Sequence, residues 1–213
     1  MDAAAGGSAG QHGSEERAGY RRSVGSPRGE ARRRELLDQV TDDLAVNGLV
    51  DFSLRRAARA AGTTHKVLLY HFDSADDLLE QAIRQLRARR IEKSLLAATD
   101  GPPGRPLADR VAALWPILVG EEARVLDQAI GLAMYDPGRH AELGRGASKQ
   151  YLPALLSICP PHWSDQRKLE VSEMILAVLR GFLVDARTSG DTDGIAAGFQ
   201  ALKRALDREE ATE

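Results

Sequence analysis

The sequence predicts an all-α protein, with an N-terminal three-helix domain and a C-terminal helical bundle that together hold about nine helices. Apolar residues recur at spacings of three and four along most of the 213-residue chain, as in helices that bury one face. No stretch alternates β-branched and polar residues, so we expect no β-sheet. Gly and Pro pairs separate the helical segments.

Residues 1–27 are rich in Gly, Ala, Ser and Arg and hold almost no large apolar side chain. Such a segment buries too little surface to offset the entropy of ordering, so we expect it to be disordered. Seven arginines and one acid lie between Arg17 and Arg34, although the whole chain has a formal net charge of only -2. This basic arm either contacts DNA or serves only to solubilise the chain.

Cysteine and apolar content favour a soluble, cytoplasmic setting. Cys159 is the single cysteine, which excludes an intrachain disulfide, and we expect it to be a small buried apolar residue. No apolar run of about 18 residues is present, so no membrane partner is expected. The N-terminus lacks the apolar core of a secretory signal.

The first helix is expected from about Arg28 to Val46, ending at Asn47-Gly48. Three later helices are expected to begin at N-caps, which are Ser53, Thr64 and Ser74. The helix after Ser74 carries Asp77 in a capping-box position and serves both domains. We therefore place the domain boundary within it, giving domains at 28–85 and 86–213.

Beyond the break at Gly101–Pro106 we expect five further helical segments. They are Leu107 to Gly120, Glu121 to Tyr135, Arg139 to Ile158, Ser164 to Ser189 and Asp191 to Arg208.

The segment from Ser53 to Phe72 predicts a helix-turn-helix. Alanines at 57, 58, 60 and 61 allow two helices to cross closely, and Gly62 suits the turn between them. The segment carries four cations and no acid, a pattern that fits contact with a phosphate backbone. An ordinary helical hairpin with a charged face is the alternative, but cap, turn, core and charge together favour DNA binding.

The run from Phe52 to Ser74, followed by Asp76-Asp77-Leu78-Leu79, resembles the TetR family of bacterial transcription regulators. The resemblance covers about Arg32 to Leu86. It implies an all-helical homodimer in which residues 28–85 bind DNA and residues 86–213 bind an effector and dimerise. Members usually repress transcription from a palindromic operator and release the DNA when a small molecule binds.

The chain departs from the common TetR pattern at four positions. Val67 and Leu69 stand where the family commonly has Thr and Tyr, Ala75 replaces a usual Lys, and Thr63 replaces a usual Val. The residues that we expect to contact double-stranded DNA are Ser53, Arg55, Arg56, Thr63, Thr64, His65, Lys66, Tyr70 and His71.

The C-terminal half is expected to hold an unknown, largely apolar effector and to form the dimer. The candidate effector-binding residues lie among the middle helices: Trp115, Leu118, Leu126, Ile130, Met134, Tyr135, Tyr151 and Leu155. The candidate dimer residues come from the last two helices: Met174, Val178, Phe182, Ile195, Phe199 and Leu202. For both sets, an ordinary intrachain core is the alternative.

No enzyme motif is present, so we expect no catalytic residue, metal site or cofactor. The chain has no phosphate-binding loop, no Gly-x-Ser-x-Gly elbow and no pair of histidines at helical i, i+4 spacing. The sequence therefore predicts a ligand-responsive, dimeric transcription repressor. The alternative is a helical effector-binding or protein-interaction module with weakened DNA binding.

Overall fold

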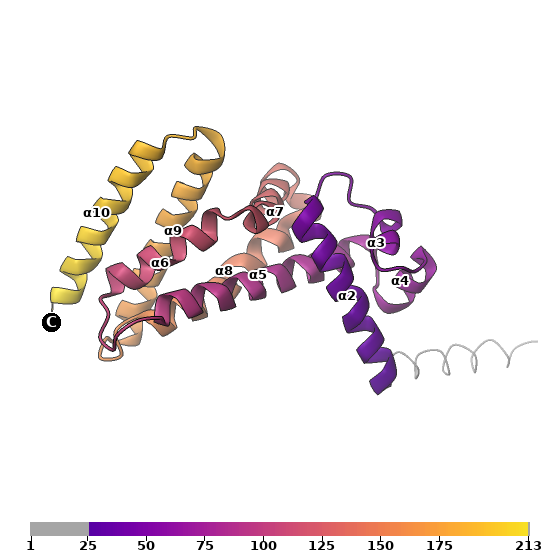
Figure 1. Ribbon diagram of the computed structural model, residues 1–213, viewed down its shortest axis with the longest axis horizontal. Helices are drawn as coiled ribbons and strands as arrows, with labels where there is room; N and C mark the ends of the chain where they lie inside the picture. The colour runs from indigo at the N-terminus through magenta and orange to yellow at the C-terminus, as the bar shows by residue number, and fades with distance from the viewer. Residues whose placement is uncertain (1–25, 213) are drawn as a thin grey trace, which may run out of the picture.

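A computed structural model describes residues 26–212 (Figure 1). The expected disordered arm lies almost wholly outside the described residues. Within them the chain is all-α, as predicted, with no strand. The elements are α2 (Pro27–Asn47), α3 (Leu54–Ala60), α4 (His65–His71), α5 (Ala75–Thr99), α6 (Leu107–Val119), the short 3-10 helix η1 (Glu121–Ala123), α7 (Arg124–Tyr135), α8 (Pro137–Ile158), α9 (Asp165–Thr188) and α10 (Thr192–Ala211).

The predicted N-caps of α3, α4 and α5 are confirmed. The side chains of Ser53, Thr64 and Ser74 each accept a hydrogen bond from the backbone N–H three residues on. At α5, Asp77 N–H donates to Ser74 Oγ at 3.0 Å, and the Asp77 carboxylate accepts from the N–H of Asp73, the residue before the cap, at 3.1 Å. These bonds satisfy backbone donors that a helix start leaves free, and so they define where each helix begins.

Helices α2, α3 and α4 gather at one end of the molecule (Figure 1). Ala57 and Ala58 are buried where α3 meets its neighbours, and Leu68 of α4 and Phe72 just after it are buried in the same cluster. Gly62 has a φ of 55°, the left-handed conformation that the turn between α3 and α4 requires. The helix-turn-helix predicted from Ser53 to Phe72 is therefore present.

Helix α5 contributes to both apolar clusters of the chain. Its first half, with Leu78 and Ile83, packs into the cluster of α2, α3 and α4, which α7 also joins through Val125. Its last turns, at Ala98, belong to a second cluster built with α6, α8, α9 and α10. One continuous helix thus connects the two halves, and a boundary between residues 85 and 86 remains a prediction.

Helices α9 and α10 run antiparallel at the end opposite the helix-turn-helix (Figure 1). A Cβ added to Gly198 would lie 2.7 Å from the ring of Phe182, so only glycine permits this close approach. No helix of residues 26–212 is long and apolar enough to cross a bilayer.

Candidate DNA-contacting surface and ligand cavity

The exposed face of α3 and α4 carries most of the residues expected to contact DNA. Arg55 projects from α3, and Thr64, His65 and Lys66 form the exposed start of α4. Ser53, also exposed, caps α3. All five are exposed, and all belong to the two helices of the motif or their caps. The free N–H groups at the start of a helix add to its attraction for phosphate.

Arg59 is a further exposed cation that the expected contact set omitted. It lies four residues after Arg55 on α3, so the two side chains share one helix face. The four-residue spacing of Arg55 and Arg59 in the sequence already indicates that they share a helix face.

The guanidinium group of Arg56 bonds within the fold and does not extend from the exposed face. Its Nε donates to Asp43 Oδ2 at 2.7 Å, and both side chains are largely buried. Its Nη atoms donate to the carbonyl oxygens of Val50 at 2.8 Å and Gly48 at 2.9 Å. Arg56 therefore ties α3 to the end of α2 and to the loop between them, and it leaves no free guanidinium edge for a phosphate.

The other expected contacts, Thr63, Tyr70 and His71, are only partly exposed. Arg33 of α2 donates through Nε to the His71 carbonyl oxygen at 3.1 Å, and the Tyr70 and His71 rings meet edge to face at 4.8 Å. Burial lowers the pKa of His71, and the charges of Arg32 and Arg33 lower it further. Its position between α4 and α2 makes His71 a packing residue of the motif.

Leu69 is the one exposed large apolar side chain of α4, with 46% of its surface accessible. It lies four residues after His65 and three after Lys66, on the face that those two residues occupy. Val67 instead packs partly buried against the core of the motif. Of the departures from the TetR pattern within α4, only Leu69 therefore alters the exposed face.

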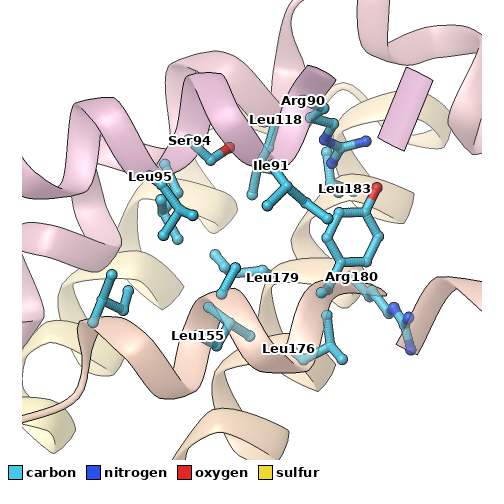
Figure 2. A pocket seen from close by; sticks show the side chains of 14 residues that line it. Arg90, Ile91, Ser94, Leu95, Leu118, Leu155, Leu176, Leu179, Arg180 and Leu183 are labelled. Carbon is cyan, nitrogen blue, oxygen red and sulfur yellow. The ribbon is translucent and has the colours of Figure 1, made fainter. Parts of the chain in front are cut away.

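A largely apolar cavity lies between α5, α6, α8 and α9 (Figure 2). It holds about 570 Å³ of space free of atoms, part of which is open to solvent. Its lining residues are Arg90, Ile91, Ser94, Leu95, Leu114, Leu118, Tyr151, Ala154, Leu155, Ile158, Leu176, Leu179, Arg180 and Leu183.

Three of the eight expected effector-binding residues line this cavity: Leu118, Tyr151 and Leu155. Trp115 instead packs against the rings of Phe182 and Phe199, at centroid distances of 6.1 and 5.5 Å.

Four expected effector-binding residues lie on α7, outside the cavity. Leu126 is buried in the cluster around the helix-turn-helix, and Ile130 is partly buried. Met134 and Tyr135, at the end of α7, are 78% and 91% exposed. Of these four residues only Leu126 is therefore buried, and it packs in the cluster around the helix-turn-helix and not in the cavity.

The polar residues that line the cavity are Arg90, Ser94, Tyr151 and Arg180. Figure 2 shows Arg90 of α5 and Arg180 of α9 toward one side and Leu95 toward the opposite side. Arg90 lies over the ring of Tyr151, 5.6 Å from its centroid, and Arg180 Nη2 donates to Ser148 Oγ at 3.2 Å. The two arginines thus lie toward one side of a lining that is otherwise almost wholly apolar.

The expected dimer residues divide into two groups. Ile195 and Leu202 are buried within the chain, so they have little surface left for a partner. The others are half-buried: Met174, Val178, Phe182 and Phe199.

The outermost face of α9 carries Ala177, Gly181 and Val184, which recur at helical spacing and are exposed. A Cβ on Gly181 would meet no atom within 4 Å. Ala197 and Ala201 are exposed in the same way on α10. These two helices therefore present small side chains outward.

Helix α7 contacts both halves of the chain through neighbouring side chains. Gln128 Oε1 accepts from the backbone N–H of Leu49 at 2.9 Å, in the loop before α3. Asp127 Oδ2 accepts from Arg187 Nε on α9 at 2.9 Å. Arg187 also donates to the Val119 carbonyl oxygen at 3.1 Å.

Groups that could support other functions are few in residues 26–212. No cluster of three His, Cys, Asp or Glu side chains that could hold a metal lies in this part of the chain. Cys159 is buried, and burial raises the pKa of its thiol. A buried neutral thiol is a poor nucleophile.

No protein-family model matches the chain, and no curated protein is similar to it in sequence. Solved structures do match. A protein proposed to be a TetR-family transcriptional regulator, from Rhodococcus sp., is 16% identical, with 83% of this chain and 96% of that chain covered and a TM-score of 0.59. A proposed transcriptional regulator from Streptomyces coelicolor A3(2) is 21% identical, with 81% and 96% covered and a TM-score of 0.62.

The multidrug binding protein EbrR, solved in complex with proflavin, is 18% identical to the chain. The match covers 81% of this chain and 98% of that one, with a TM-score of 0.59. The three neighbours share the helix-turn-helix end and the helical body over nearly their whole length. The chain has the fold of the TetR-family transcriptional regulators.

Proposed function

We propose that the chain is a dimeric, DNA-binding transcriptional regulator whose affinity for its operator falls when a small molecule occupies the cavity. One observation carries the proposal. In the capped pair α3 and α4, Arg55, Arg59, His65 and Lys66 are all exposed, and the segment from Ser53 to Phe72 contains no acid. Such a surface attracts phosphates and can lay α4 in a major groove.

Dimerisation is proposed through the outer faces of α9 and α10. Helices approach closely where the side chains at the contact are small, and Ala177, Gly181, Ala197 and Ala201 meet that condition. A two-fold axis there would relate two helix-turn-helix units. Their α4 helices would then meet major grooves about 34–36 Å apart, or a multiple of that distance. The operator is accordingly expected to be palindromic.

Repression with release by an effector is the mode of action that we favour. The cavity lies on α5, α6, α8 and α9, and α5 also runs into the cluster around the helix-turn-helix. A ligand that fits one arrangement of these helices better than another would shift the DNA-binding units through α5 and α7. The structural neighbour EbrR was solved with proflavin and supports a small-molecule role for this cavity.

Selection of bound sequences from a random DNA library tests the proposal. The purified protein is expected to enrich a palindrome, with affinity that falls steeply as salt rises. Enrichment of no sequence above the input at low salt would contradict DNA recognition. Enrichment of a single unpaired half-site would contradict the dimer while leaving DNA recognition in place.

Leu69 favours a second candidate function, a ligand- or protein-binding module that no longer reads DNA. An exposed leucine beside His65 and Lys66 suits an apolar partner surface as well as a thymine methyl. This candidate predicts that Arg55→Ala and Lys66→Ala leave all binding unchanged. It also predicts that the library selection enriches nothing.

A further inference from the structure

Arginines lie in and beside the cavity: Arg90 and Arg180 line it, and Arg87 is close by on α5 without lining it. Arg87 and Arg90 are three residues apart on α5 and therefore lie on the same side of that helix. Arg180 of α9 lines the same cavity as Arg90. Arg87 is 3% exposed, while Arg90 and Arg180 are partly buried.

The bonds that these arginines make are to neutral groups. Arg87 donates to the Leu143 carbonyl oxygen and, at 3.4 Å, to Gln150 Oε1. Arg180 donates to the Ser148 hydroxyl, and the buried Nε of Arg90 has no hydrogen-bond acceptor. Across residues 26–212, no ion pair joins any of the three guanidinium groups to a carboxylate, whereas the neighbouring Arg84 and Arg89 both have one.

Burying a guanidinium group without a carboxylate partner costs folding free energy. Burial lowers the pKa of Arg87, and the positive charges of Arg180 and Arg84 lower it further, although Tyr151 and Glu80 act in the opposite direction. A buried or half-buried guanidinium normally has an anionic partner, because removal from water disfavours an isolated charge. Arg90 and Arg180 line the cavity and have no carboxylate partner within residues 26–212, so an anion bound there would supply the missing counter-charge.

We propose that the cavity binds an amphipathic anion, with its acidic headgroup against Arg90 and Arg180 and its apolar body along Leu95, Leu155 and Leu179. The proposal rests on the effector site of the proposed function and names the chemical class of its ligand. A guanidinium presents paired N–H donors that match a carboxylate or a phosphate. The three leucines supply the apolar contact that the body of the ligand requires.

Binding of four ten-carbon amphiphiles tests the headgroup preference. Decanoate and decyl phosphate are the anionic probes, 1-decanol the neutral one and decyltrimethylammonium the cationic one, each measured by calorimetry on the full chain without DNA. We expect decanoate or decyl phosphate to bind at least about tenfold more tightly than 1-decanol, which is the size of one charge-assisted hydrogen bond. The cation is expected not to bind. Which anion binds more tightly identifies the headgroup.

Two substitutions test the arginines themselves. Arg180→Gln is expected to weaken binding of the anion about tenfold or more and to leave 1-decanol unaffected. Arg90→Met is expected to have the same effect on the anion while the melting temperature of the unliganded protein stays equal or rises, since an unpaired charge is removed. A purely structural arginine would instead lower the melting temperature. Arg208→Ala, on the exposed face of α10, is the control.

Three results would overturn the inference: equal affinity for anion and alcohol, tighter binding of the cation, or no binding of any of the four probes. None of these bears on the library selection, so a failure here is distinguishable from a failure of DNA recognition. If the anion binds but does not weaken operator binding, the headgroup assignment holds and the release step of the proposed function fails.

Discussion

Gln128 of α7 accepts a hydrogen bond from the backbone N–H of Leu49, 2.9 Å away in the loop that leads into α3. The preceding residue, Asp127, pairs with Arg187 of α9 at 2.9 Å. One turn of α7 therefore contacts both the helix-turn-helix and a helix that lines the cavity. A small rotation of α7 would change both contacts together. Under the proposed function, α7 therefore connects ligand binding in the cavity with DNA binding.

Gln128→Ala is expected to leave operator affinity without ligand nearly unchanged and to reduce the ligand's effect on that affinity. Substitutions along such contacts alter coupling by about 0.5–2 kcal/mol. Operator binding with and without saturating ligand, measured by fluorescence anisotropy, checks this. Gln200→Ala, exposed on α10, is the matched control. An unchanged ratio of the operator affinities with and without ligand would show that Gln128 takes no part in the coupling.

Arg56 and Arg59 are expected to behave differently although both are arginines of α3. Arg56→Ala breaks the largely buried pair with Asp43 and leaves two carbonyl oxygens without a donor, so unfolding free energy should fall by about 2–4 kcal/mol. Arg59→Ala should change stability by less than about 0.5 kcal/mol and weaken DNA binding. Urea unfolding and operator binding distinguish them. Equal losses of stability would contradict the assignment.

Leu69 is expected to read a thymine methyl in the major groove. Leu69→Ala should reduce discrimination at one A·T base pair of each half-site by about 1 kcal/mol, while affinity for the other positions is retained. Library selection with the variant gives the base preference at every position. If preference is lost evenly across the site, Leu69 acts through the backbone or the fold instead.

Because of His71, we expect the folded protein to become less stable as the pH falls. Burial and the charges of Arg32 and Arg33 hold its folded-state pKa below the ordinary 6.5, so the unfolded chain takes up the proton at a higher pH than the folded one. The contribution of neutral His71 to the free energy of unfolding is complete above pH 6.5. It is lost as the pH falls from 6.5 through the folded-state pKa. Urea midpoints measured between pH 7.5 and pH 5 should therefore decrease toward acid.

His71→Gln should flatten that pH dependence, and His65→Gln, exposed on the same helix, should not. A wild-type slope that survives in His71→Gln would assign the effect to another group.

The proposed dimer face predicts the effect of a charge on α9. Val184→Glu should shift the protein toward monomer and reduce operator affinity at least about tenfold, because an unpaired charge would be buried in the interface. Sedimentation measures the mass. Leu96→Glu, equally exposed but on α5, should leave the mass unchanged. A dimer that tolerates Val184→Glu places the interface elsewhere.

The sequence predicted the helices well because their determinants are local. Ser53, Thr64 and Ser74 act on backbone groups within their own first turns, and Gly62 acts through its own φ. Arg56 was predicted as a DNA contact and is instead paired with Asp43, thirteen residues away, because that contact exists only once α2 and α3 cross.

The cavity was the least predictable feature. Its arginines come from α5 and α9, helices that the sequence pattern associates with the domain boundary and the dimer. The apolar stripe of α7, by contrast, resembles a pocket wall but packs on the N-terminal helices at Leu126 and is exposed at Tyr135. Periodicity reveals that a face is buried and does not reveal what covers it.

The affinity of the double variant Arg55→Ala, Lys66→Ala for the selected operator tests the central claim most directly. It should be measured across a salt series beside the wild type and Arg208→Ala. The account predicts weaker binding at every salt concentration and a salt slope smaller by about two, one for each lost phosphate contact, with Arg208→Ala unchanged. An operator affinity and salt slope equal to those of the wild type would contradict it.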